Sequence, residues 1–144
     1  MHKINLYVGL KIPDTTAITT FHTLEKLGFK NLKKLTREIY CSFEFRGDES
    51  EFKKKISKVD ILVNANKNKV RYELDDDAVH VLVKDIGDKC EGLCPTLQER
   101  LGLKEIISME KGTLWSLEGV DKETAEKIAK KLLYNKHYQE IKIL

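Results

Sequence analysis

The chain has 144 residues, of which 41% are hydrophobic and 34% charged, and its formal net charge is +3. This length allows one ordinary domain or two very small ones, and the composition is that of a charge-rich globular protein. No apolar run approaches the roughly 20 residues that a membrane span needs. Lysines and glutamates alternate along the chain, whereas a dedicated nucleic-acid binder clusters its basic residues. We therefore expect neither a membrane nor a nucleic acid as partner.

The cysteine and glutamine content and the N-terminal residues give further expectations about heat adaptation, metal binding and cellular location. Glutamine is scarce beside abundant Lys and Glu, a composition typical of heat-adapted proteins. The cysteines are Cys41, Cys90 and Cys94, an odd number without the spacing of a zinc site, which favours reduced thiols and no bound metal. A strand pattern begins at residue 4, so we expect no signal peptide and a cytoplasmic location.

The first half of the chain predicts a strand, a helix, a strand, a helix and a strand. Residues 4–11 and 39–45 alternate between apolar and polar side chains, the pattern of half-buried strands. Residues 17–27 have apolar positions at helical spacing and end at Gly28, a typical helix stop. Asp48 and Glu51 have capping-box spacing, which predicts a helix continuing to Leu62. Alternation returns over residues 70–74 and predicts the last strand.

The second half predicts the same five elements after an acidic linker at residues 75–77. Strand patterns cover residues 79–83, 107–117 and 141–143, and helical spacing covers residues 93–101 and 125–133. Gly102 is expected to stop the first of these helices, and Asp121 to cap the second.

The two halves match in order, which predicts an internal duplication with one copy in residues 1–75 and the other in residues 78–144. A module of about 70 residues is marginal alone, so the copies are expected to pack as a covalent dimer with pseudo-twofold symmetry. The predicted fold class is α+β, an α/β sandwich with antiparallel sheets and helices on one face. Exchange of strands between the modules remains open at this stage.

No group of residues predicts catalysis. Phosphate-binding glycine loops and a nucleophile elbow are absent, and His22, His80 and His137 are expected at or near the surface. We therefore expect no catalytic, cofactor-binding or metal-binding residue. Asn64 and Asn135 follow the second helix of each half, where a helix cap is favoured over a binding role. Trp115 is a candidate for an outward aromatic side chain at a partner surface.

Three segments of the second half carry a family resemblance. Residues 101–103 (Leu-Gly-Leu), 110–119 (Glu-Lys-Gly-Thr-Leu-Trp-Ser-Leu-Glu-Gly) and 125–135 (Ala-Glu-Lys-Ile-Ala-Lys-Lys-Leu-Leu-Tyr-Asn) resemble the PurS subunit of phosphoribosylformylglycinamidine synthase. That family has a Leu-Gly helix end, a short strand opening at Gly-Lys and a helix closing at Leu-Leu-x-Asn. The first half resembles it more loosely, at residues 27–29 and 62–64. The chain thus resembles a tandem fusion of two PurS-like modules.

The resemblance implies an accessory subunit of purine biosynthesis without an active site of its own. Such a subunit bridges the large synthetase (PurL-like) and the glutaminase (PurQ-like) subunits and helps ammonia pass between them; further self-association is compatible with it. The candidate partner surface then includes Gly112, Trp115, Asn64 and Asn135. Two rival hypotheses remain. The first is a diverged PurS-like paralogue that senses a small ligand or serves another partner. The second is a nucleic-acid binder that uses Tyr7, Tyr40 and Trp115.

Overall fold

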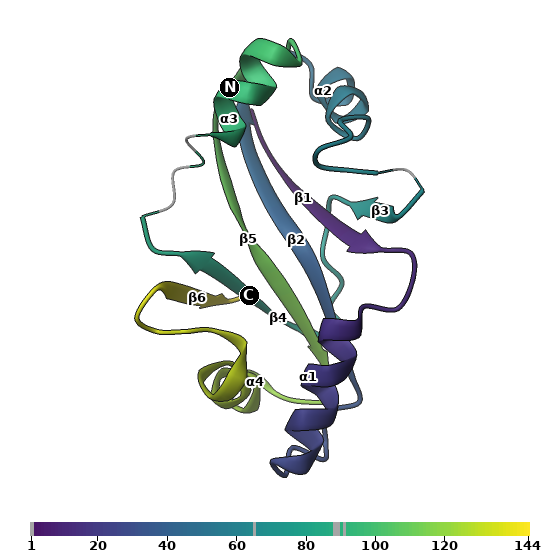
Figure 1. Cartoon of the computed structure of the whole chain (residues 1–144), viewed down its shortest axis with the longest axis vertical. Coiled ribbons are helices and arrows are strands. Elements are labelled where there is room, and N and C mark those ends of the chain that lie inside the picture. The colour runs from purple at the N-terminus through teal and green to yellow at the C-terminus, as the bar shows by residue number, and fades with distance from the viewer. Residues whose placement is uncertain (1, 65, 88–89, 91) are drawn as a thin grey trace. The chain divides into compact units, whose positions relative to one another are not determined.

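The computed structural model describes residues 2–64, 66–87, 90 and 92–144 (Figure 1). The elements are β1 (His2–Leu10), α1 (Thr15–Lys26), β2 (Lys34–Phe45), α2 (Glu49–Ile56), β3 (Asn68–Arg71), β4 (Val79–Asp85), α3 (Leu93–Pro95) continued by the π-helical turn η1 (Thr96–Arg100), β5 (Ile106–Glu118), α4 (Lys122–Ile128) continued by the π-helical turn η2 (Ala129–Leu133), and β6 (Gln139–Ile143).

The fold is α+β, as predicted. Within the described residues, six strands form one sheet in the order β3-β1-β2-β5-β4-β6. β1 pairs antiparallel with β2 and β3, and β4 pairs antiparallel with β5 and β6. Each half of the chain therefore places its first strand between its second and its third.

The chain divides into two compact units that do not follow the two halves of the sequence. Unit 1 comprises residues 1–11, 39–73 and 87–111, and unit 2 comprises residues 12–38, 74–86 and 112–144. Unit 1 therefore contains α2 from the first half and α3 with η1 from the second. Unit 2 contains α1 and α4. The boundary predicted between residues 75 and 78 concerns the sequence repeat and stays a prediction. In the structure, the first helix of the first half (α1) belongs to unit 2, and the first helix of the second half (α3) belongs to unit 1.

The core of unit 1 lies between one face of its strands and its helices. Period-two alternation turns Ile4, Leu6 and Val8 of β1 to the same side as the apolar positions of β2. On α2, Phe52 stacks on Phe45 with ring centroids 4.1 Å apart. Burying one such side chain contributes about 1.5–3 kcal/mol, so this helix is held mainly by its packing. The other fully buried side chains in the core of unit 1 are Cys41, Phe43, Ile56 and Leu97.

The core of unit 2 is built in the same way around β4 and β5. Helices α1 and α4 supply small and branched side chains that pack on one face of the strands. Asp14 caps α1 by accepting hydrogen bonds from the backbone N–H groups of Thr16 and Ala17. The carboxylate of Asp14 also accepts two hydrogen bonds from Arg37, at 2.9 and 3.1 Å. The core side chains of this unit include Ala17, Leu24, Val81, Val83, Trp115, Leu117, Ala125 and Ile128.

Several predicted elements differ from the structure in their bounds or in their helix type. α2 ends at Ile56 and not at Leu62, because the chain continues in tight turns with Val59 N–H donating to Ile56 and Leu62 N–H donating to Val59. These turns keep Val59 buried, so the apolar spacing persists without a regular helix. β3 stops at Arg71, three residues short of the predicted end. The helix predicted over residues 93–101 is partly π-helical.

Candidate functional site

Trp115 lies in the core of unit 2, where only 7% of the residue is exposed. The guanidinium carbon of Arg37 lies 5.9 Å from its ring centroid, within the range of a cation–π contact. Tyr7 and Tyr40 in unit 1 are likewise only 4% and 6% exposed. The three aromatic residues considered for base stacking are therefore covered, and none offers a free face for a nucleic acid.

Gly112 lies in β5, next to Thr113, which pairs with Val83 of β4. A Cβ atom at this position would meet the carbonyl oxygen of Val83 at 2.6 Å and the side chain of Lys84 at 2.9 Å. Glycine is therefore needed for the close approach of the two strands. This packing role is sufficient to explain the residue, and its part in a partner surface remains a prediction.

Asn64 and Asn135 shape the turn that leads into the last strand of each half. The side chain of Asn64 accepts a hydrogen bond from Asn66 N–H at 3.0 Å, and its own N–H donates to Asn68 Oδ1 at 2.9 Å. In the other half, Asn135 accepts from His137 N–H at 2.9 Å and donates to Gln139 Oε1 at 3.0 Å. The side chains of both asparagines therefore form the hydrogen bond of an Asx-type turn.

His80 is more deeply buried than the sequence suggested, with 4% of the residue exposed. Its Nδ1 lies 2.8 Å from Ser116 Oγ, and its Nε2 lies 2.8 Å from the carbonyl oxygen of Asp75. A carbonyl oxygen can only accept, so Nε2 donates to it, and in the neutral form of the ring Nδ1 accepts from the Ser116 hydroxyl. Because Ser116 is itself only 6% exposed, this arrangement lacks the reachable hydroxyl that nucleophilic catalysis needs.

An acidic hollow of about 430 Å³ opens beside His80 in unit 2. Its lining includes Asp75, Asp76 and Asp77 from the linker and Lys122 from the start of α4. No group of three or more His, Cys, Asp or Glu residues in the described part of the chain is arranged to hold a metal ion. The linker aspartates therefore act as a charged wall of the hollow without forming a ligand set.

The three cysteine side chains lie in and around the core of unit 1. Burial raises the pKa of the Cys41 thiol from 9.0 to about 11, and it also raises the pKa of Cys94. A reactive cysteine needs the opposite shift, because the thiolate is the nucleophile. Neither residue is therefore suited to thiol chemistry at neutral pH.

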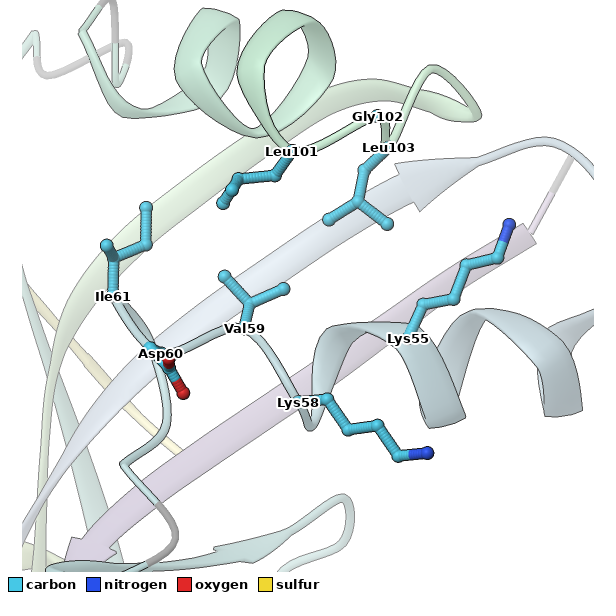
Figure 2. A pocket seen from close by; sticks show the side chains of 8 residues that line it. All are labelled: Lys55, Lys58, Val59, Asp60, Ile61, Leu101, Gly102 and Leu103. Carbon is cyan, nitrogen blue, oxygen red and sulfur yellow. The ribbon is translucent and has the colours of Figure 1, made fainter.

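A second hollow, of about 470 Å³, lies entirely in unit 1 (Figure 2). The turns after α2 contribute Val59 and Ile61, and the segment after η1 contributes Leu101 and Leu103; Figure 2 shows these aliphatic side chains gathered around one space. Lys55, Lys58, Asp60 and Gly102 complete the lining. We call these eight residues the unit 1 groove. Sequence reasoning missed it because it assigned residues 59–62 to a helix.

Comparison with protein-family models and with curated proteins finds no match for this chain. Among the described residues, no helix combines the length and apolar character needed to cross a membrane. The resemblance to PurS therefore rests on the sequence segments and their arrangement alone.

Proposed function

We propose that the protein is a non-catalytic accessory subunit that resembles PurS of phosphoribosylformylglycinamidine synthase. In this proposal it works in the cytoplasm, bridges a large synthetase subunit and a glutaminase subunit, and holds two copies of the PurS-like module in one chain. The observation that carries the proposal is the repeated architecture, because the resemblance requires a strand-helix-strand-helix-strand module and the chain contains this order twice.

The turns before the last strands support the duplication in atomic detail. Lys11 N–H donates to the carbonyl of Lys67 at 2.8 Å, and Ile86 N–H donates to the carbonyl of Tyr138 at 2.8 Å. In both halves the bond joins the residue after the first strand to the turn organised by Asn64 or Asn135. The shared bonding pattern supports a common origin of the two halves.

The chemistry of the described residues also supports an accessory role. The one histidine–serine contact is buried, the Cys41 thiol has a raised pKa, and the glycine at position 112 serves strand packing. These groups hold the fold together. What the surface offers instead is an apolar hollow with exposed walls, a feature typical of contact with another molecule.

Co-purification tests this function. The tagged full-length chain is isolated from a lysate of its source, with and without glutamine and ADP, and bound proteins are identified by mass spectrometry. We expect a synthetase and a glutaminase, held more firmly when both small molecules are present. Recovery of neither subunit under either condition would overturn the proposal.

The second candidate is a diverged PurS-like protein that senses a small ligand. The two hollows of about 470 and 430 Å³ favour it, since ligand sites commonly measure about 300–1,000 Å³. A thermal-shift panel of metabolites discriminates the candidates, because a ligand at 100 times its Kd adds about 2.7 kcal/mol of stability. A flat panel together with recovered synthetase and glutaminase selects the accessory subunit.

A further inference from the structure

Strand β6 is the last strand of the sheet and, among the described strands, pairs with β4 alone (Figure 1). At one end of this ladder Ile86 N–H donates to the Tyr138 carbonyl, and at the other end Leu144 N–H donates to the His80 carbonyl, both at 2.8 Å. In an antiparallel pair, hydrogen-bonded positions alternate with non-hydrogen-bonded ones. The even-numbered residues of β6 therefore bond to β4, and the odd-numbered residues direct their backbone groups outward.

The outward edge of β6 is suited to a further strand. The N–H groups of Ile141 and Ile143 point away from β4, whereas Gln139 N–H donates to the Asn135 carbonyl at 2.8 Å. The side chains of the two isoleucines lie on the core face and are only partly buried there. A strand edge is a template for pairing unless proline, a bulge or like charges protect it. The strand reads Gln-Glu-Ile-Lys-Ile, and its register with β4 runs without a bulge.

The charges on the other face of β6 complement a second copy of the same strand. Glu140 and Lys142 are both exposed and flank Ile141. If two β6 strands run antiparallel with Ile141 opposite Ile141, Glu140 of each copy lies opposite Lys142 of the other. These two residues then occupy non-hydrogen-bonded positions, where opposite side chains are closest. A shift of one strand by two residues would place Glu140 opposite Glu140, or Lys142 opposite Lys142.

The corresponding edge strand of the first half, β3, lacks this complementarity. Lys11 N–H donates to the Lys67 carbonyl, so the same alternation makes Val70 an outward residue of β3. Antiparallel self-pairing around Val70 would place Lys69 of one copy opposite Arg71 of the other. Like charges directly opposite each other are destabilising. Charge therefore opposes self-pairing at β3 and favours it at β6.

We propose that the outward edge of β6 pairs antiparallel with β6 of a second copy of this chain and forms a symmetric dimer. Ile141 N–H of each copy donates to the Ile141 carbonyl of the other, and Ile143 N–H donates to the Gln139 carbonyl. The isoleucine side chains of the two copies then lie side by side on the core face and cover one another. Twofold symmetry makes every contact reciprocal. This dimer is independent of the proposed synthetase and glutaminase partners.

Exchange of the two charges tests the pairing in the full-length chain. Sedimentation velocity is measured from about 5 to about 500 µM protein, because a short strand forms an interface below the size of stable complexes. The variants are Glu140→Lys, Lys142→Glu and the double exchange of both residues. Lys30→Glu is the control, since it makes the same change of charge at an exposed position of unit 2.

Circular dichroism and urea midpoints establish that each variant is folded. Lys142→Glu is the cleaner single variant, because Lys142 lies opposite Leu82 on β4, whereas Glu140 lies opposite Lys84. The double exchange keeps the net charge of the natural protein and restores opposite charges across the pair.

We expect the natural protein, the control and the double exchange to dimerise with similar Kd. Each single variant should raise the Kd at least tenfold, equivalent to about 1.4 kcal/mol. An equimolar mixture of Glu140→Lys and Lys142→Glu should dimerise again, because the lysines of one copy then lie opposite the glutamates of the other. The proposal fails if the natural protein stays monomeric throughout the concentration range, if Lys142→Glu dimerises as tightly as the natural protein, or if the mixture dimerises no better than its components.

Discussion

His80 and Ser116 face each other across β4 and β5, with Nδ1 and Oγ 2.8 Å apart and both residues almost fully buried. The histidine is held at its other nitrogen by the carbonyl of Asp75, at 2.8 Å. The contact ties the linker between the halves to the middle of a sheet. It replaces, for both side chains, the hydrogen bonds to water that burial removes.

The Ser116→Ala variant should therefore lose stability. It leaves the Nδ1 acceptor of a buried ring unpaired, at a cost of about 1–3 kcal/mol in the free energy of unfolding. Urea denaturation measures the loss. The control is His22→Ala, because the His22 side chain is 63% exposed and such surface changes stay within about 0.5 kcal/mol. A Ser116→Ala loss no larger than that of the control would contradict the assignment.

The two aspartate caps should contribute differently to stability, since Asp14 accepts two backbone N–H hydrogen bonds and Asp48 accepts one. Asp14 and Asp48 both cap helices, but only Asp14 also receives two hydrogen bonds from Arg37. Asp48→Ala should cost about 1 kcal/mol for the cap alone. Asp14→Ala should cost up to about 1 kcal/mol more, because Arg37 is partly exposed and its ion pair is screened by solvent.

Salt provides the check on this difference. Sodium chloride at 1 M shortens the screening length to about 3 Å, so the gap between Asp14→Ala and Asp48→Ala should shrink while the common cap loss persists. Equal losses of the two variants at low salt would show that Arg37 adds nothing.

Substitution of Gly112 should disturb the pairing of β4 and β5. Gly112→Ala places a Cβ atom 2.6 Å from the Val83 carbonyl oxygen, and relief of such overpacking costs about 1–3 kcal/mol. Gly92→Ala is the control, since its Cβ meets nothing within 4 Å. Thermal unfolding of both variants by circular dichroism decides the matter, and an unchanged melting temperature for Gly112→Ala would refute the close approach.

Stability should fall at alkaline pH partly because of Cys41. Its pKa rises on folding from 9.0 to about 11, so between these values the folded state binds more protons than the unfolded state. The contribution is complete below pH 9 and is lost as the pH rises through 11. Cys41→Ala should unfold more easily at pH 7 but show a shallower decline between pH 8.5 and about 10.5 in urea titrations. Parallel declines for the two proteins would contradict the raised pKa.

Local chemistry made much of the fold predictable. The first strand, the glycine stop after α1 and the caps at Asp48 and Asp121 appear in the structure, but the alternation does not, because Tyr7 and Gly9 are buried as well as Leu6 and Val8. Each depends on neighbours a few residues away, and periodicity records such neighbours directly. The unit 1 groove could not be found in this way, because its two walls come from segments that are remote in the sequence and that periodicity does not bring together.

By itself, the sequence determined the order of the ten helical and extended segments and the helix caps at Asp48 and Asp121. Only the tertiary structure decided that α1 belongs to unit 2 and that α3 belongs to unit 1. The physical reason is that both halves present similar apolar strand faces, so a helix of either half finds a suitable surface in both. The burial of His80 and Trp115 was also not predictable from the sequence. Alternation assigns a side chain to one face of a strand but does not say which other element covers that face.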